Sequence, residues 1–254
     1  MTTSMDSVDC NESKPKKCPP PQPSWGRIIF QSSFAAFMTT YIYGLLAVPA
    51  VAVFHHAHQP LGLYGYGALH AAILFPLGLV FNQFGGWIYF TPGLAVAEFF
   101  CSELRRPWMI GLKAFIGTLF AAGGFWASYA TAQGIYNFSL HRASPPTHLG
   151  FFGDFFLDFI AVLLVTHVYC FSSREYSGVW GVAGISIAHG AVTTLLYPAI
   201  GSADNFWRVL AACTLEGNCN HVGWGPKLLA WVVAVLVVGI VKFIFWPLYK
   251  LKQM

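Results

Sequence analysis

The chain has 254 residues, of which 56% are hydrophobic, 17% aromatic and only 9% charged, with a formal net charge of +4. An ordinary soluble domain carries a charged share near a quarter, so this composition and the mean hydropathy of +0.57 exclude that class and predict a polytopic membrane protein. We expect a lipid bilayer around the protein, and no nucleic acid, cofactor or metal ion as a partner.

The chain is expected to begin with a disordered cytoplasmic tail over residues 1–24, which are polar, lysine-containing and proline-rich. Six apolar segments then follow, each able to cross roughly 30 Å of hydrocarbon as a helix. A second short tail is expected over residues 247–254. The predicted spans are 27–53, 64–85, 108–131, 151–171, 179–198 and 225–246.

The basic residues predict how these spans are oriented. Six crossings place both termini on one side, and all but three of the 14 lysines and arginines fall there; the exceptions are Arg142, Arg208 and Lys227. Because cytoplasmic loops carry an excess of lysine and arginine, both termini are predicted to be cytoplasmic. The membrane itself, plasma or internal, is left open, as are the glycosylation of Asn137 and a disulfide between Cys213 and Cys219.

Two polar or glycine-containing stretches, 86–93 and 199–208, interrupt the apolar sequence, one in each half of the chain. Each offers a helix N-cap, Thr91 with Pro92 after it in the first and Asn205 in the second. We therefore expect two re-entrant half-helices that enter from opposite faces, as in proteins built from inverted repeats. Non-helical backbone at membrane depth must be buried or line a cavity, so the breaks predict a pore.

Three further polar residues lie within the predicted spans. Asp154 and Asp158 are four residues apart and share one helix face, where they are expected to support nearby backbone or to face the pore. An intramembrane enzyme that uses these acids is the weakest interpretation, because no activated nucleophile or metal motif accompanies them. His189 is kept as a secondary candidate at the pore.

The layout resembles the aquaporin family over nearly the whole of residues 25–246. Members carry two Asn-Pro-Ala motifs, each at the start of a half-helix, with an arginine directly after the second. Here Thr91-Pro92-Gly93 stands at the first motif and Asn205-Phe206-Trp207-Arg208 at the second. Asp154 is similar to the buried acid of the family's fourth span, and residues 221–226 resemble the usual entry to the sixth.

The resemblance implies an all-α membrane protein with six transmembrane helices and two re-entrant half-helices, its repeats at about 25–134 and 150–246. It also implies a homotetramer and a passive channel, not an enzyme, for water or small neutral solutes such as glycerol. Thr91, Pro92, Gly93, Asn205, Phe206 and Trp207 would then lie at the pore midplane. Ungapped counting places Ala71 and Thr193 at the selectivity constriction with Arg208.

Neither motif is intact, so the chain is expected to be a divergent member. Phe206 and Trp207 add large rings near the meeting point of the half-helices, and these rings could narrow or close the pore. The alternative is therefore a closed, aquaporin-like structural subunit of a larger membrane complex.

Overall fold

The computed structural model describes residues 24–56, 63–91, 94–95, 98, 107–136, 149–175 and 178–200. Towards the C-terminal end it describes 207, 210–211, 214–215, 228–234, 236–237 and 240. Regular structure within these residues is entirely helical. In chain order the elements are α1 (Trp25–His56), α2 (Leu63–Phe81), η1 (Asn82–Phe84), η2 (Trp87–Phe90), α4 (Pro107–Tyr136), α5 (Gly150–Glu175) and α6 (Val179–Ile200).

The first five predicted spans are helices, and their bounds differ from the prediction in both directions. α1, α4 and α5 extend beyond the apolar windows, because no proline or glycine pair stops them there. α2 instead ends at Phe81, before the predicted bound, because the chain tightens into η1. The sixth predicted span is helical at 228–234, and most of its remainder lies outside the described residues.

Four described helices are long and apolar enough to cross a membrane: Trp25–Ala47, Gly67–Phe84, Trp108–Ile135 and Gly150–Tyr169. Val179–Leu195 is a shorter apolar helix. The outer surface matches a lipid environment, because large side chains such as Phe30, Phe152 and Trp180 are at least 70% exposed. These features define the class, an all-α membrane protein.

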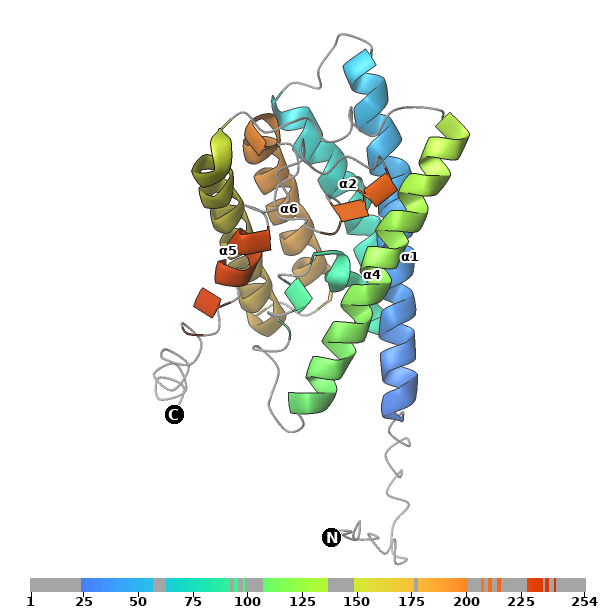
Figure 1. Cartoon of the computed structure of the whole chain (residues 1–254). Coiled ribbons are helices and arrows are strands. Elements are labelled where there is room, and N and C mark those ends of the chain that lie inside the picture. Colours follow the sequence, from blue (N-terminus) through green and yellow to red (C-terminus); the bar gives the residue numbers. More distant parts are fainter. Residues whose placement is uncertain are drawn as a thin grey trace, which may run out of the picture.

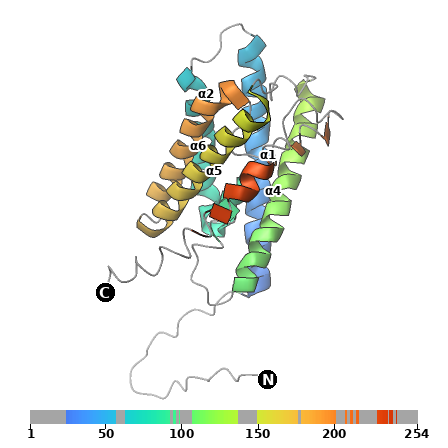
Figure 2. The ribbon, with the colours of Figure 1, turned by 60° about the vertical axis from the view of Figure 1, so that its left-hand side comes forward.

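The helices pack as two principal pairs, α1 with α4 and α2 with α6, and α5 covers α6 from the other side. Figure 1 shows α1 and α4 together at one side of the bundle and α5 and α6 at the other, with α2 between them. The colours show that α1, α4 and α6 run in one direction and α2 and α5 in the other (Figures 1 and 2).

Glycines allow both principal pairs to approach closely. A Cβ built on Gly124 of α4 would lie 2.5 Å from the carbonyl oxygen of Phe37 on α1. Gly67 and Gly190 make the corresponding contact between α2 and α6. Small residues at helix crossings are the usual means of tight packing in membranes, where apolar burial alone gives no driving force.

Candidate functional site

The break after α2 replaces the α-helix with two short 3₁₀ helices, η1 and η2, and its second part, residues 86–91, is buried. Gly85 adopts a positive φ of 71° at the end of η1, and the chain re-coils as η2 before Thr91 becomes extended, with φ −118° and ψ 137°. A Cβ on Gly86 would fall 1.7 Å from the carbonyl oxygen of Ser32 on α1, so only glycine allows this approach. The four η2 side chains are at most 5% exposed. Over the described residues 86–91, the expected interruption of the helix is therefore present and packed inside the bundle.

Thr91 makes the contact expected of a helix N-cap. Its side chain is 2% exposed, and its hydroxyl oxygen accepts a hydrogen bond from the backbone N–H of Leu94 at 3.4 Å. Leu94, Ala95 and Glu98 are helical. An N-cap hydroxyl bonded to the third following amide satisfies one of the free donors at a helix start.

A partly buried ion pair connects the segment after Thr91 to α4. Nζ of Lys113 lies 2.6 Å from Oε1 of Glu98, and the two side chains are 12% and 19% exposed. The Tyr89 hydroxyl of η2 donates to Oε2 of the same carboxylate. Lys113 also lies over the Tyr89 ring, 5.8 Å from its centroid. The carboxylate thus connects η2, the segment after Thr91 and α4.

Tyr89 lies outside the four span-length segments. Burial raises the pKa of its phenol above the ordinary value. The charge of Glu98 and the hydrogen bond to Glu98 raise this pKa further, and so does the electrostatic interaction with Tyr169. Tyr89 therefore stays a protonated donor to Glu98 at physiological pH.

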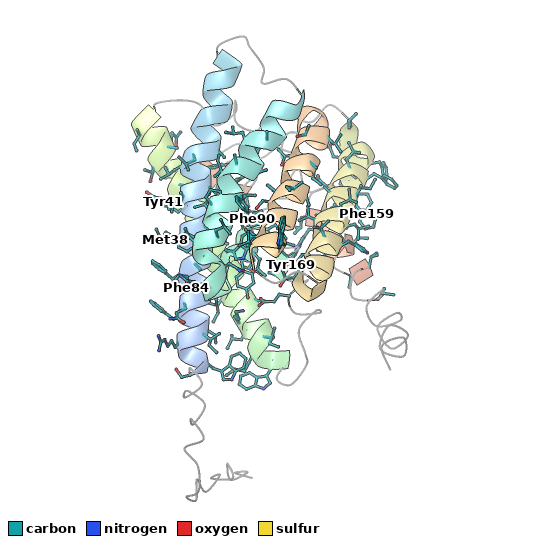
Figure 3. All side chains as sticks on the ribbon, turned by 180° about the vertical axis from the view of Figure 1, so that it is seen from behind. Met38, Tyr41, Phe84, Phe90, Phe159 and Tyr169 are labelled. Carbon is teal, nitrogen blue, oxygen red and sulfur yellow. The ribbon has the colours of Figure 1, made fainter. Side chains whose placement is uncertain are left out.

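A second set of polar side chains meets at the centre of the bundle. The Tyr43 hydroxyl of α1 forms a hydrogen bond with Nδ1 of His70 on α2 and lies 3.4 Å from Nε2 of His189 on α6. All three side chains are at most 2% exposed. Phe90 of η2 packs edge-on against His189, with ring centroids 5.0 Å apart. Figure 3 shows Phe90 in the middle of the bundle.

We call these four residues, Tyr43, His70, Phe90 and His189, the central cluster. The Tyr43 and His70 ring centroids are 5.6 Å apart, and those of the two histidines are 6.1 Å apart. Polar side chains at the middle of apolar helices are costly, and they usually mark a functional site. Phe90, a member of the central cluster, directly precedes Thr91. The cluster therefore connects the break in the backbone to α1, α2 and α6.

Three of the other expected site residues, Ala71, Thr193 and Trp207, lie in the described ranges. Thr193 is 4% exposed and follows His189 by about one turn of α6. Ala71 faces α6, because a Cβ built on Gly190 would lie 3.0 Å from the Cβ of Ala71. Trp207 is partly buried against the hydrophobic core. Pro92, Gly93, Asn205, Phe206 and Arg208 lie outside the described residues, as do Asn137, Cys213 and Cys219.

Asp154 and Asp158 are both buried on α5, each at 2% exposure. Oδ1 of Asp154 has no hydrogen-bond partner among the described residues, whereas Asp158 interacts with its surroundings. α5 packs against α6, the helix that carries His189. The two carboxylates therefore lie on the helix that packs against α6, and they are not members of the central cluster.

Sequence reasoning did not single out Tyr43 or His70, and it considered His189 alone. The available signal was a tyrosine and two histidines, each inside an apolar span, but one sequence does not show that three separate helices turn these side chains toward one point. Within the described ranges, no group of three or more His, Cys, Asp or Glu residues could hold a metal ion. Comparison with models of known families and with curated proteins finds no match for the chain.

Proposed function

We propose that the protein is a passive transmembrane channel for water or small neutral solutes such as glycerol, built on the aquaporin plan with six spans and two re-entrant half-helices. The observation that carries the proposal is the contact between a buried backbone break and a buried polar cluster. Phe90 and Thr91 belong to the break, and Phe90 packs on His189 of the cluster. A transport site at mid-membrane commonly combines interrupted backbone with convergent polar side chains.

The chemistry of this region favours neutral solutes. Tyr43, His70, His189 and Thr193 can each donate or accept hydrogen bonds without carrying a permanent charge. The capped helix that begins after Thr91 would present the positive end of its dipole to the same region, which disfavours cations. The proposed activity is therefore the passage of a solute without catalysis. The proposal also includes cytoplasmic termini and assembly as a homotetramer.

One observation favours the alternative, a closed subunit that supports a larger membrane complex. Trp207 packs against the same hydrophobic core that contains Tyr43 and Phe90. A tryptophan at the second motif in place of a small residue could fill the space through which a solute would pass. The two functions differ in one measurable property, the permeability of the purified protein.

The decisive experiment is osmotic shrinkage of proteoliposomes, followed by stopped-flow light scattering. Wild-type protein is compared with empty vesicles, with Thr193→Trp, which would obstruct the proposed path, and with Trp207→Ala, which would widen it. Gradients of sucrose, glycerol and urea separate water from solute passage, and crosslinking in detergent reports the tetramer. The channel predicts wild-type shrinkage faster than empty vesicles and its loss in Thr193→Trp. Wild-type rates equal to empty vesicles under every gradient and buffer pH would refute it, and rates restored by Trp207→Ala would support the closed subunit.

A further inference from the structure

Several buried hydroxyl groups of the long helices are satisfied by the backbone of their own helix. The Thr40 hydroxyl, for example, donates to the carbonyl oxygen of Ala36 at 2.9 Å, a common arrangement for threonine inside a helix. Thr39 on α1 and Ser186 on α6 are different. Both side chains are at most 1% exposed, and neither hydroxyl oxygen has a hydrogen-bond partner in the part of the chain that the structure describes. Because a buried hydroxyl without a partner is costly, these two groups are candidates for binding a ligand.

Thr39 and Ser186 lie at the same level of the bundle. The Tyr43 hydroxyl and Nε2 of His189, which are 3.4 Å apart, relate α1 to α6, and the two helices run in the same direction (Figures 1 and 2). Thr39 precedes Tyr43 by four residues and Ser186 precedes His189 by three, so they lie about 6 Å and about 4.5 Å further along the bundle in the same direction. The Ser33 hydroxyl also lacks a partner, but it lies about 15 Å from Tyr43 along α1.

The intervening helix α2, which runs the opposite way, gives the same level independently. The hydrogen bond of the central cluster between α1 and α2 places Thr39 opposite Leu74, because four residues back along α1 correspond to four residues on along α2. A Cβ built on Gly78 would lie 2.5 Å from Cγ1 of Val182. Ser186, four residues beyond Val182, is therefore also opposite Leu74. The two hydroxyls thus flank one buried position of α2, one helical turn from the central cluster.

The lengths of the side chains explain why the two hydroxyls do not pair with each other. Tyr43 and His189 meet across the bundle because both side chains are long. Thr39 and Ser186 are together several ångströms shorter, so another molecule must supply their partners. Each hydroxyl offers one donor and two acceptor positions and no charge, which suits a neutral ligand. A small polyol has hydroxyl groups on neighbouring carbons and can bond to both sides at once.

We propose that Thr39 and Ser186 form a subsite that binds a small polyol through its hydroxyl groups, one turn from the central cluster. This inference rests on the proposed channel function, which it deepens by naming the solute class and a binding step. On α6 the hydrogen-bonding groups of Ser186, His189 and Thr193 follow one another at helical spacing, so the solute passes from one to the next. Water can satisfy each hydroxyl singly, so polyol passage depends on the pair more than water passage does.

The test measures glycerol and water permeability in proteoliposomes. Thr39→Val and Ser186→Ala remove the hydroxyls with little change of shape, and each should lower glycerol permeability several-fold while water permeability changes less. Because one glycerol molecule would contact both groups, the double variant should be close to the single variants. The matched controls are Thr40→Val and Ser128→Ala, whose buried hydroxyls donate to their own helix backbone and whose loss should leave glycerol passage at the wild-type rate.

Three results would overturn the subsite. One is glycerol permeability that remains at the wild-type rate in Thr39→Val and Ser186→Ala, with higher melting temperatures, because replacing a hydroxyl that binds nothing relieves an unpaired group. Another is an equal fall in water and glycerol permeability, which would indicate water as the ligand. The third is losses that add in the double variant, which would mean that the two hydroxyls do not share a molecule. Thermal unfolding in detergent shows that each variant is folded.

A readout that does not depend on transport separates failure of the subsite from failure of the channel. Magic-angle-spinning NMR of ¹³C-threonine-labelled protein in liposomes with ¹³C-glycerol should give a glycerol cross-peak to Thr39, assigned by its loss in Thr39→Val, and none to Thr40. The absence of a Thr39 cross-peak in a protein that passes glycerol would overturn the subsite and leave the channel. A Thr39 cross-peak with permeability equal to that of empty vesicles would keep the subsite and refute the channel.

Discussion

Gly67 on α2 and Gly190 on α6 lie backbone against backbone. A Cβ built on Gly67 would come 2.2 Å from the carbonyl oxygen of Gly190, and a Cβ on Gly190 would come 2.5 Å from the carbonyl oxygen of Gly67. Both distances are too short for any real contact, so only glycine allows the crossing. Gly190 directly follows His189, and Gly67 precedes His70 by three residues. The crossing therefore sets how closely the two histidines approach.

Substitution of Gly190 by alanine is expected to force α2 and α6 apart. The added methyl group would meet backbone atoms that cannot rotate away, so we expect a loss of about 1–3 kcal/mol in the free energy of unfolding. Thermal unfolding in detergent measures this loss. Gly134→Ala on α4 is the control, because a Cβ there meets nothing within 4 Å. Equal melting temperatures for Gly190→Ala and wild type would contradict the close crossing.

Two adjacent glycines on α4 allow a sharper comparison. A Cβ on Gly124 would lie 2.1 Å from Oγ1 of Thr40 and 2.5 Å from the carbonyl oxygen of Phe37, whereas a Cβ on Gly123 meets nothing within 4 Å. Gly124→Ala should therefore lower the melting temperature. Gly123→Ala should leave it unchanged or raise it, because alanine is favoured over glycine inside a helix by up to about 1 kcal/mol. The opposite order would mean that α4 is rotated relative to α1.

The sequence is enough to predict the helices but not their pairing. Long apolar segments between polar breaks indicate spans by themselves, but the bound predicted at residue 85 falls after the observed end of α2 at Phe81, where the chain enters η1. The central cluster depends on rotation about each helix axis, and its members are separated by 27 and 146 residues along the chain. Hydropathy treats Tyr43 and His70 as isolated polar residues in apolar segments. Only the packing of α1, α2 and α6 brings them together with His189.

Removal of Lys113 is expected to destabilise the protein through Glu98. In Lys113→Met the carboxylate would stay largely buried with the Tyr89 hydroxyl but without its cation, at a cost of about 3 kcal/mol. The double variant Glu98→Gln/Lys113→Met removes both charges and should recover part of that loss. Arg27→Met, at an exposed position, serves as the control. The single variants Glu98→Gln and Lys113→Met and the double variant are compared by chemical unfolding. If the losses of the two single variants add up to that of the double variant, the two charges are not coupled.

The hydroxyl of Thr91 gives a prediction that joins stability to transport. Thr91→Val keeps the shape of the side chain but removes the acceptor for the Leu94 amide, so the helix start would lose about 1 kcal/mol. Thr91→Ser keeps the hydroxyl and should be close to wild type in stability. Because Thr91 adjoins Phe90 of the central cluster, Thr91→Val should also alter the permeability of proteoliposomes, while Thr91→Ser should not. If valine and serine at this position gave the same unfolding free energy and the same permeability, the hydroxyl would be neither the cap of the helix that begins after Thr91 nor part of the proposed solute path.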